Sequence, residues 1–169
     1  MKELSYIRGI NQKIIIMTKT EALEFINNSN KETEEKLDAK IRTLRDAIEK
    51  GNPKDVRLDV RSFESLLTDV IKYKWSKQRP ETFLNCYVTG DEYYGISNAP
   101  YSYFMKTVNG DFREFMSLNE LDDRHMYANG KCTDEDRMKM FRKRLDFVEY
   151  YLMDEELDII AWCFNNICI

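Results

Sequence analysis

The sequence predicts a mainly α-helical protein of class α+β, a helical bundle built on an antiparallel helical hairpin with a small β-hairpin insertion. Apolar residues recur at helical spacing on both sides of Gly51-Asn52-Pro53, which is typical of two helices joined by a tight turn. Further along, Asn109-Gly110 is flanked by apolar and aromatic residues, a pattern that favours a two-residue β-hairpin turn.

We expect one domain over residues 1–169, because 169 residues with 43% hydrophobic content are enough to bury a core. Within it, residues 18–75 should hold the N-terminal helices with the long hairpin. Residues 76–117 should form a turn-rich segment with the β-hairpin, and residues 118–169 the C-terminal helices.

The first long helix of the hairpin is expected to follow Ser29. Ser29 and Glu32 have the spacing of a capping box, in which each side chain accepts a hydrogen bond from a free backbone N–H group. Apolar residues then repeat at steps of 4, 3 and 4 on one helical face, namely Leu37, Ile41, Leu44 and Ile48. Gly51 follows, where a left-handed residue can end the helix.

The second long helix is expected to start at Asn52-Pro53, with asparagine as N-cap and proline in the first helical position. Its apolar residues continue the same spacing as far as the region of Trp75, with Val56, Val60, Phe63, Leu67 and Val70. An alternative interpretation takes Val56, Leu58 and Val60 as a short alternating strand that ends at Ser62.

A short helix is predicted before the hairpin, over residues 19–27, because Thr18 and Glu21 form another capping-box pair. The polar run at 27–30 should interrupt it. In the turn-rich segment, a turn at Asn109-Gly110 would place Phe104 opposite Phe115 in the two strands. The alternative there is a helix from Pro100 to Gly110.

Helical patterns return in the last third of the chain. Ser117 and Glu120 are expected to cap a short helix, and Thr133 should begin a longer one whose first turn is acidic. Its predicted buried residues are Met138, Phe141, Leu145, Val148 and Leu152. Asp154 should cap a final helix that is central to the packing and carries Leu157, Ile160, Ala161 and Phe164.

Composition points to a cytoplasmic protein. The chain has no run of about 20 apolar residues such as a membrane helix needs. Its cysteines follow no disulfide or zinc-finger pattern, so we expect reduced thiols at Cys86, Cys132, Cys163 and Cys168. The net charge of −4 is unevenly spread, since residues 1–79 carry 17 Lys+Arg against 13 Asp+Glu, and residues 111–169 carry 8 against 14.

Catalytic signatures are absent from the sequence, and we expect no enzyme activity, cofactor or metal. His125 is the one histidine, so paired-histidine metal motifs are excluded, and Cys132 is its only nearby thiol. Carboxylates that could hold a divalent metal flank the turn near His125. They define the alternative of a metal-dependent hydrolase or nuclease, with Asp122, Asp123, Asp134, Glu135 and Asp136 as candidates.

A second alternative is a nucleic-acid-binding regulatory protein. Cations alternate with aromatic residues at the end of the second long helix, a composition suited to phosphate contacts and base stacking. The candidates are Lys72, Lys74, Trp75, Lys77 and Arg79. The structural interpretation is that the aromatics pack at the helix end while the cations favour its carboxyl-terminal dipole.

The function that the sequence favours most is binding to a protein partner through an acidic, tyrosine-rich surface. Tyrosine is enriched at protein interfaces, and it is concentrated here at Tyr93, Tyr94, Tyr101 and Tyr103, near the acidic residues Asp122, Asp123, Asp134, Glu135 and Asp136. By compositional analogy, small acidic proteins of this kind are stoichiometric inhibitors, such as toxin-immunity proteins or phage anti-CRISPR-like antagonists. The expected partner is therefore a basic effector that handles nucleic acid.

Overall fold

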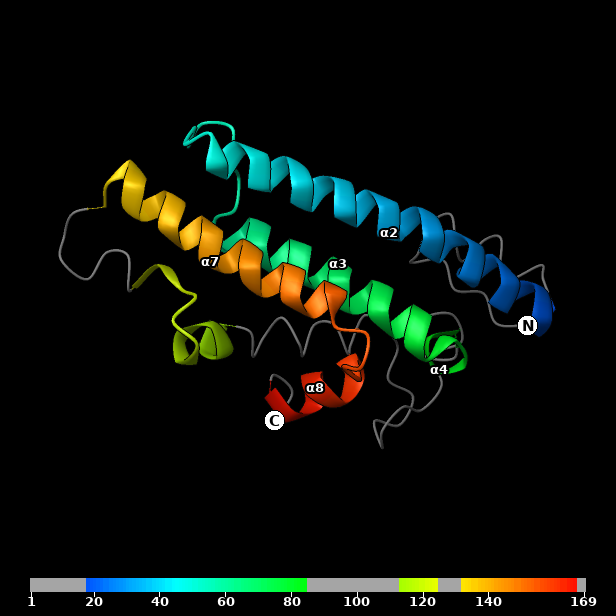
Figure 1. The fold of residues 1–169 in the computed structure, drawn as a ribbon. Helices are drawn as coiled ribbons and strands as arrows, with labels where there is room; N and C mark the ends of the chain where they lie inside the picture. The colour runs from blue at the N-terminus through cyan, green and yellow to red at the C-terminus, as the bar shows by residue number, and fades with distance from the viewer. Residues whose placement is uncertain (1–17, 85–112, 125–131, 167–169) are drawn as a thin grey trace.

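The computed structural model describes residues 18–84, 113–124 and 132–166, and the regular elements within these ranges are all helices (Figure 1). They are α2 (Lys19–Glu49), α3 (Val60–Gln78), α4 (Pro80–Leu84), α7 (Asp134–Met153) and α8 (Ile159–Asn166), with a further short helical segment over 113–118. The mainly α-helical class is therefore confirmed.

The predicted β-hairpin insertion is not supported. Its turn at Asn109-Gly110, and the competing helix from Pro100, lie outside the described residues. Phe115, expected in the second strand, instead lies in the helical segment over 113–118, where it is buried. Ser117 and Glu120 end this segment rather than capping a new helix, since Glu120 has a positive φ of 57°.

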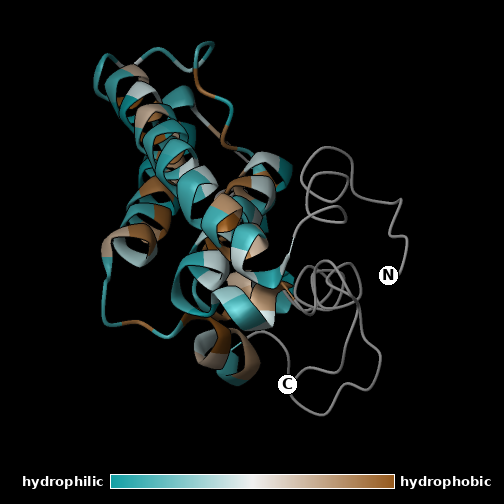
Figure 2. Cartoon of the chain, turned by 90° about the vertical axis from the view of Figure 1, so that its right-hand side faces the viewer, coloured by the Kyte–Doolittle hydropathy of each residue, from teal (hydrophilic) through white to brown (hydrophobic). Residues whose placement is uncertain are grey.

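The three long helices lie side by side, with α2 antiparallel to both α3 and α7 (Figure 1). The carboxyl-terminal half of α2 lies against α7, and its amino-terminal half lies against α4. The short helix α8 packs against α3. Figure 2 shows hydrophilic residues along the outer sides of the helices and hydrophobic residues where the helices meet. No helix in the described ranges is long and apolar enough to cross a membrane.

Helix α2 is one element of 31 residues, whereas the sequence predicted a short helix and then a second start at Ser29. The capping box of Thr18 and Glu21 is present as predicted, with hydrogen bonds of 3.2 and 3.1 Å. The prediction of a capping box at Ser29 and Glu32 is wrong, because Ser29 lies inside a continuous helix, where its carbonyl accepts a hydrogen bond from the Thr33 hydroxyl. Packing of Ala22 and Ile26 before the polar run, and of Leu37 after it, keeps the helix intact.

The turn after α2 ends the helix as expected but is longer than predicted. Gly51 has φ 67°, and the N–H groups of Gly51 and Asn52 donate to the carbonyls of Ile48 and Ala47. This pairing is a Schellman motif, in which two free carbonyls at the helix end are satisfied.

Helix α3 begins at Val60 with Asp59 as its N-cap, so the prediction of a start at Asn52-Pro53 is wrong. Val56 and Leu58 are buried while Arg57 is exposed, which is the alternation that the alternative of a short strand predicted. These residues nevertheless form no strand. Two buried side chains therefore come from the connection rather than from the helix. The predicted apolar face is otherwise confirmed, with Phe63, Leu67 and Val70 fully buried.

Helix α7 follows its prediction closely. Thr133 and Asp136 form a capping box, and all five predicted apolar residues are buried. Asp154 accepts hydrogen bonds from the N–H groups of Glu156 and Leu157, but α8 starts after Asp158, which accepts those of Ile160 and Ala161. The prediction for this last helix holds in part: Ile159, Ile160 and Cys163 are fully buried, whereas the predicted Ala161 and Phe164 are half-buried and Leu157 lies before the helix.

Candidate functional site

Two large apolar side chains lie on the outer side of α7 and are open to solvent. Tyr150 is 63% exposed and Met153 is 62% exposed, and they are one helical turn apart. Among the described residues the other large exposed hydrophobic side chain is Leu118, at 78%, which lies on the 113–118 segment. Single exposed apolar residues are common, but two adjacent ones on a rigid helix form a candidate interaction site.

An arginine from α2 borders this pair. The Arg45 guanidinium donates to Asp146 Oδ1 at 2.7 Å and also to Glu149 Oε2, so it bridges two consecutive turns of α7. Glu149 and Asp146 together raise the pKa of Arg45 above its usual value, against the opposing effect of partial burial. Arg45, Asp146, Glu149, Tyr150 and Met153 line one shallow surface depression, which we call the Tyr150 face.

Buried and half-buried aromatic rings support the Tyr150 face from behind. The Tyr150 ring meets Tyr151 edge to face at 5.2 Å, and Tyr151 packs on Trp162 of α8 at 4.7 Å and on Phe147 at 4.6 Å. Phe115 of the 113–118 segment closes the cluster against Trp162 at 5.5 Å. Because aromatic packing of this kind restricts side-chain movement, Tyr150 projects from a rigid base.

The charge near the Tyr150 face is negative on balance. Arg45 carries one positive charge against the carboxylates of Asp146 and Glu149. The chain after Met153 continues with three acidic residues, of which Glu155 and Glu156 are exposed. A partner that contacts Tyr150 and Met153 would therefore meet an acidic surrounding.

Most of the acidic residues predicted to bind a partner have local structural roles. Asp122 pairs with Arg124 at 2.7 Å, Asp123 pairs with Arg144, and Asp134 pairs with Arg137 at 3.4 Å. Asp136 belongs to the capping box, and its hydrogen bonds with Thr133 lower the pKa of its carboxyl. Glu135 is exposed in the first turn of α7. The four predicted tyrosines, Tyr93, Tyr94, Tyr101 and Tyr103, lie outside the described residues.

The residues predicted to bind nucleic acid mainly join α3 to the carboxyl-terminal end of α7. Lys74 is buried and donates to the carbonyls of Tyr151, at 2.6 Å, and Asp154. Trp75 is fully buried and packs on Phe83 of α4 at 5.6 Å. Lys77 pairs with Glu155, Arg79 pairs with Asp158, and Lys72 lines a groove between α2 and α3.

A metal or thiol site is not formed by the described part of the chain. No group of three His, Cys, Asp or Glu side chains there is arranged to hold a metal ion. Cys163 is a buried free thiol and Cys132 a partly buried one, while His125, Cys86 and Cys168 lie outside the described ranges.

Sequence reasoning missed the Tyr150 face, although a signal for it exists. Asp146, Tyr150 and Met153 are spaced by 4 and 3 residues, the helical step, and lie off the buried line of Leu145, Val148 and Leu152. An apolar residue on the polar side of an amphipathic helix is such a signal.

Comparisons with protein-family models, curated proteins and solved structures find no match to this chain.

Proposed function

We propose that this protein acts by binding another protein, and that the Tyr150 face is its contact surface. The observation that carries the proposal is the pair of exposed side chains, Tyr150 and Met153, held on a rigid helix above an aromatic cluster. Tyrosine, methionine and arginine are the residue types enriched at the centres of protein interfaces, and this face contains one of each.

The partner that this surface suits is basic. The carboxylates of Asp146 and Glu149 are fixed by Arg45, so their positions are set before a partner arrives. Complementary charge speeds association and selects the partner, while the central apolar contacts supply most of the affinity. Effectors that handle nucleic acid carry basic surfaces, and we therefore propose a stoichiometric inhibitor of such an effector, comparable to a toxin-immunity protein or a phage anti-CRISPR-like antagonist.

Affinity capture from the native cells tests this function. The wild-type protein should retain a basic partner at equal stoichiometry, and the double variant Tyr150→Ser/Met153→Ser should lose it. Leu118→Ser is the matched control, because Leu118 is at least as exposed but lies on a different segment. Capture of the same partner by all three proteins would show that the Tyr150 face is not the contact surface. Capture of no partner by the wild type would contradict the proposal that the protein binds another protein.

The inhibitory part of the proposal needs a separate readout. Binding of the captured effector to its nucleic acid should fall as the protein is added and reach its minimum at one molecule per effector. Because charge complementarity contributes to association, inhibition should weaken as salt is raised. If the protein left the effector's binding to nucleic acid unchanged, it would bind the effector without inhibiting it, and the inhibitor role would be wrong.

A further inference from the structure

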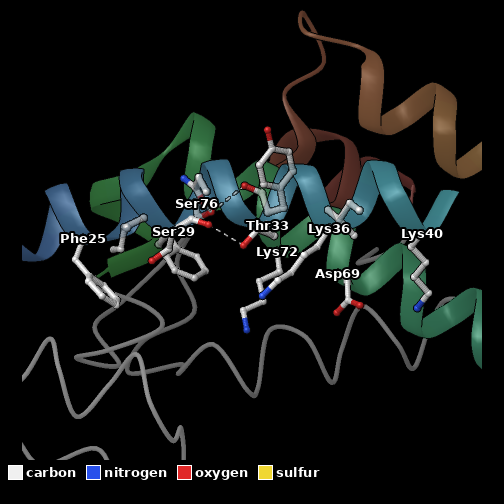
Figure 3. A pocket seen from close by; sticks show the side chains of 13 residues that line it. Phe25, Ser29, Thr33, Lys36, Lys40, Asp69, Lys72 and Ser76 are labelled. Atoms are coloured by element: carbon white, nitrogen blue, oxygen red, sulfur yellow. Dashed lines mark hydrogen bonds between the residues drawn. The ribbon is translucent and has the colours of Figure 1, made fainter. Parts of the chain in front are cut away.

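A depression lined by cations lies where the carboxyl-terminal half of α2 faces the start of α3. Its volume is about 480 Å³, within the range of roughly 300–1,000 Å³ that small-molecule sites occupy. The cations come from three segments, with Lys40 on α2, Lys54 and Arg57 on the connection, and Arg61 on α3. Figure 3 shows Lys40 extending from α2 on the side where α3 lies. We call this site the basic depression, and it shares no lining residue with the Tyr150 face.

The basic depression has an excess of positive charge. Among the described residues that line it, Asp55 is the one acidic residue, so four positive charges face one negative charge. The Asp55 carboxylate accepts a hydrogen bond from the Asn52 amide at 2.5 Å. Asp59 does not line the depression, and as the N-cap of α3 it accepts a hydrogen bond from the Ser62 N–H. An excess of three positive charges is therefore left for a ligand.

The four cationic side chains of the basic depression form no ion pair or hydrogen bond with the described residues of the chain. Loss of solvent raises the pKa of Asp69, further along α3, and Lys40 acts to lower it. Most other lysines and arginines in the described ranges do pair with a carboxylate, as Lys50 does with Asp46 at 2.8 Å. The basic depression thus gathers cations that the fold itself does not neutralise.

Apolar side chains form part of the wall. Leu44 and Leu58 line the depression and are themselves buried. The Leu58 carbonyl accepts a hydrogen bond from Arg144 at 3.0 Å, which fixes the connection against α7. A hollow with charges of one sign and walls of low dielectric constant focuses the electric field and concentrates ions of the opposite sign. The geometry therefore favours an anion that enters the depression.

The hydrogen-bond donors of the depression suit phosphate. The guanidinium groups of Arg57 and Arg61 are planar forks that can donate two parallel hydrogen bonds to phosphate oxygens. The hydroxyl groups of Ser62 and Ser65, in the first two turns of α3, add neutral donors to the same depression. A phosphate group carries roughly −1.5 to −2 charges near neutral pH, so one phosphate leaves part of the positive excess unbalanced and two balance it.

We propose that the basic depression binds a small polyphosphate, a ligand with two or three linked phosphate groups whose oxygens accept hydrogen bonds from Lys40, Lys54, Arg57 and Arg61. A nucleic-acid strand suits the site less. No aromatic side chain among the described residues lines it for base stacking, and the net charge of −4 opposes a long polyanion. The four cations also gather at one depression, whereas a strand needs a row of contacts along its backbone.

This inference does not depend on the proposed function, because no described residue of α7 lines the basic depression. Tyr150→Ser/Met153→Ser should bind the polyphosphate as the wild type does, and Arg57→Gln/Arg61→Gln should keep the protein partner. Failure of one proposal can therefore be told from failure of the other.

Isothermal titration calorimetry of the full chain with inorganic tripolyphosphate tests the site. The buffer contains no divalent cation and has a constant ionic strength, because divalent cations bind phosphates and salt screens charges. We expect one-to-one binding of tripolyphosphate, and orthophosphate should bind at least about tenfold more weakly because it carries less charge. No binding of tripolyphosphate, or equal affinity for the two anions, would overturn the proposal.

Charge-matched variants locate the contact. Arg57→Gln/Arg61→Gln should weaken tripolyphosphate binding at least about tenfold, because two charged donors are lost. Lys139→Gln/Arg142→Gln removes the same two charges from exposed positions of α7 and should change the affinity by no more than about twofold. Equal losses in the two variants would show that only the net charge of the chain matters, and would contradict the site.

A second pair of cations keeps the test valid if the first variant does not fold. Lys40→Gln/Lys54→Gln changes exposed residues of α2 and the connection, and it should also weaken tripolyphosphate binding at least about tenfold. Circular dichroism establishes that each variant is folded. Unchanged affinity in a folded variant of either pair would overturn the proposal.

Two further ligands separate the possible sources of the phosphates. ATP should bind about as tightly as tripolyphosphate, because no described aromatic side chain lines the depression to stack on its base. Much tighter binding of ATP would contradict the inference that the phosphates alone are recognised. A single-stranded oligonucleotide that bound more tightly than tripolyphosphate, and lost affinity in Arg57→Gln/Arg61→Gln, would overturn the choice of a small polyphosphate in favour of nucleic acid.

Discussion

Arg144 shows how a charged residue is accommodated in this core. Its side chain has no exposed surface, and it donates to the carbonyls of Leu121, at 2.9 Å, and Leu58, at 3.0 Å, and to Asp123. These groups belong to two segments, since Leu58 precedes α3 whereas Leu121 and Asp123 both follow Leu118. The guanidinium therefore joins α7 to the connection before α3 and to the segment after Leu118.

Replacing Arg144 with Met should lower the free energy of unfolding by about 3–5 kcal/mol, because Asp123 and two carbonyls lose a buried charged donor. Arg142→Met changes an exposed residue of the same helix and should stay within about 0.5 kcal/mol. Urea denaturation of both variants measures the difference. Similar stability of the two variants would contradict a structural role for Arg144.

Burial of Lys74 should make the free energy of unfolding depend on pH, with a sign that follows from its pKa. Burial lowers the pKa of the Lys74 ammonium below its ordinary value of 10.5, although Asp154 and Glu155 act to raise it. Between the lowered folded-state pKa and 10.5 the unfolded chain binds more protons, so the free energy of unfolding rises with pH in that window. Below the window the penalty for the buried charge is fully present.

The variant Lys74→Met lacks the titrating ammonium, so its comparison with the wild type isolates the effect of Lys74 ionisation on the free energy of unfolding. The stability of the wild type relative to Lys74→Met should increase as pH rises from 7 toward 10.5, as measured by denaturation at a series of pH values. The other titrating groups are shared by both proteins and cancel. A stability difference that stayed constant or decreased with pH would show that the lysine is not desolvated in the folded state.

Sequence spacing was a good guide to single apolar residues and a poor guide to charged ones. Leu37, Ile41, Leu44 and Ile48 are buried as their periodicity predicts. Arg144 and Lys74 look like ordinary surface cations in the sequence, and they are buried because carbonyls from distant segments accept their hydrogen bonds. Such long-range partners leave no local pattern.

Backbone geometry fixes the end of α2. Gly51 has φ 67°, and an added Cβ would meet no atom within 4 Å, so any cost of a side chain there comes from the backbone alone. Two hydrogen bonds of the Schellman motif depend on this conformation.

Gly51→Ala should therefore lower the free energy of unfolding by roughly 1–2 kcal/mol, the usual penalty for a left-handed residue with a Cβ. Gly51→Asn should cost less, because asparagine tolerates this conformation better. Thermal or urea unfolding of the two variants gives the order. If Gly51→Asn lowered the free energy of unfolding as much as Gly51→Ala, the left-handed backbone conformation would not be the cause of the loss.

Helix starts were harder to predict than helix ends. Both Ser29–Glu32 and Thr18–Glu21 match the capping box, yet only the second one is used, because the helical packing of α2 continues through the first. Asn52-Pro53 likewise resembles a helix start, whereas Asp59 caps α3. Local capping signals compete with one another, and tertiary packing decides among them.

Ion pairs within the fold account for part of the uneven charge of the sequence. Basic residues of the first half pair with acidic residues of the second half, as in Arg45 with Asp146 and Arg79 with Asp158. The asymmetry that suggested a charged partner therefore also holds α2 and α3 to the carboxyl-terminal part of the chain. The class of the fold followed from periodicity, whereas the Tyr150 face and the basic depression depend on how helices pack, which periodicity does not specify.

The proposed function requires that Tyr150 and Met153 contact a protein partner. Isothermal titration calorimetry measures the affinity of the captured partner for the wild type, Tyr150→Ser/Met153→Ser and Leu118→Ser. We predict one-to-one binding by the wild type, a loss of at least about tenfold in affinity for the double variant, as for central interface residues, and a change within about twofold for Leu118→Ser. Equal affinity of the double variant and the wild type, with both folded, would contradict the claim.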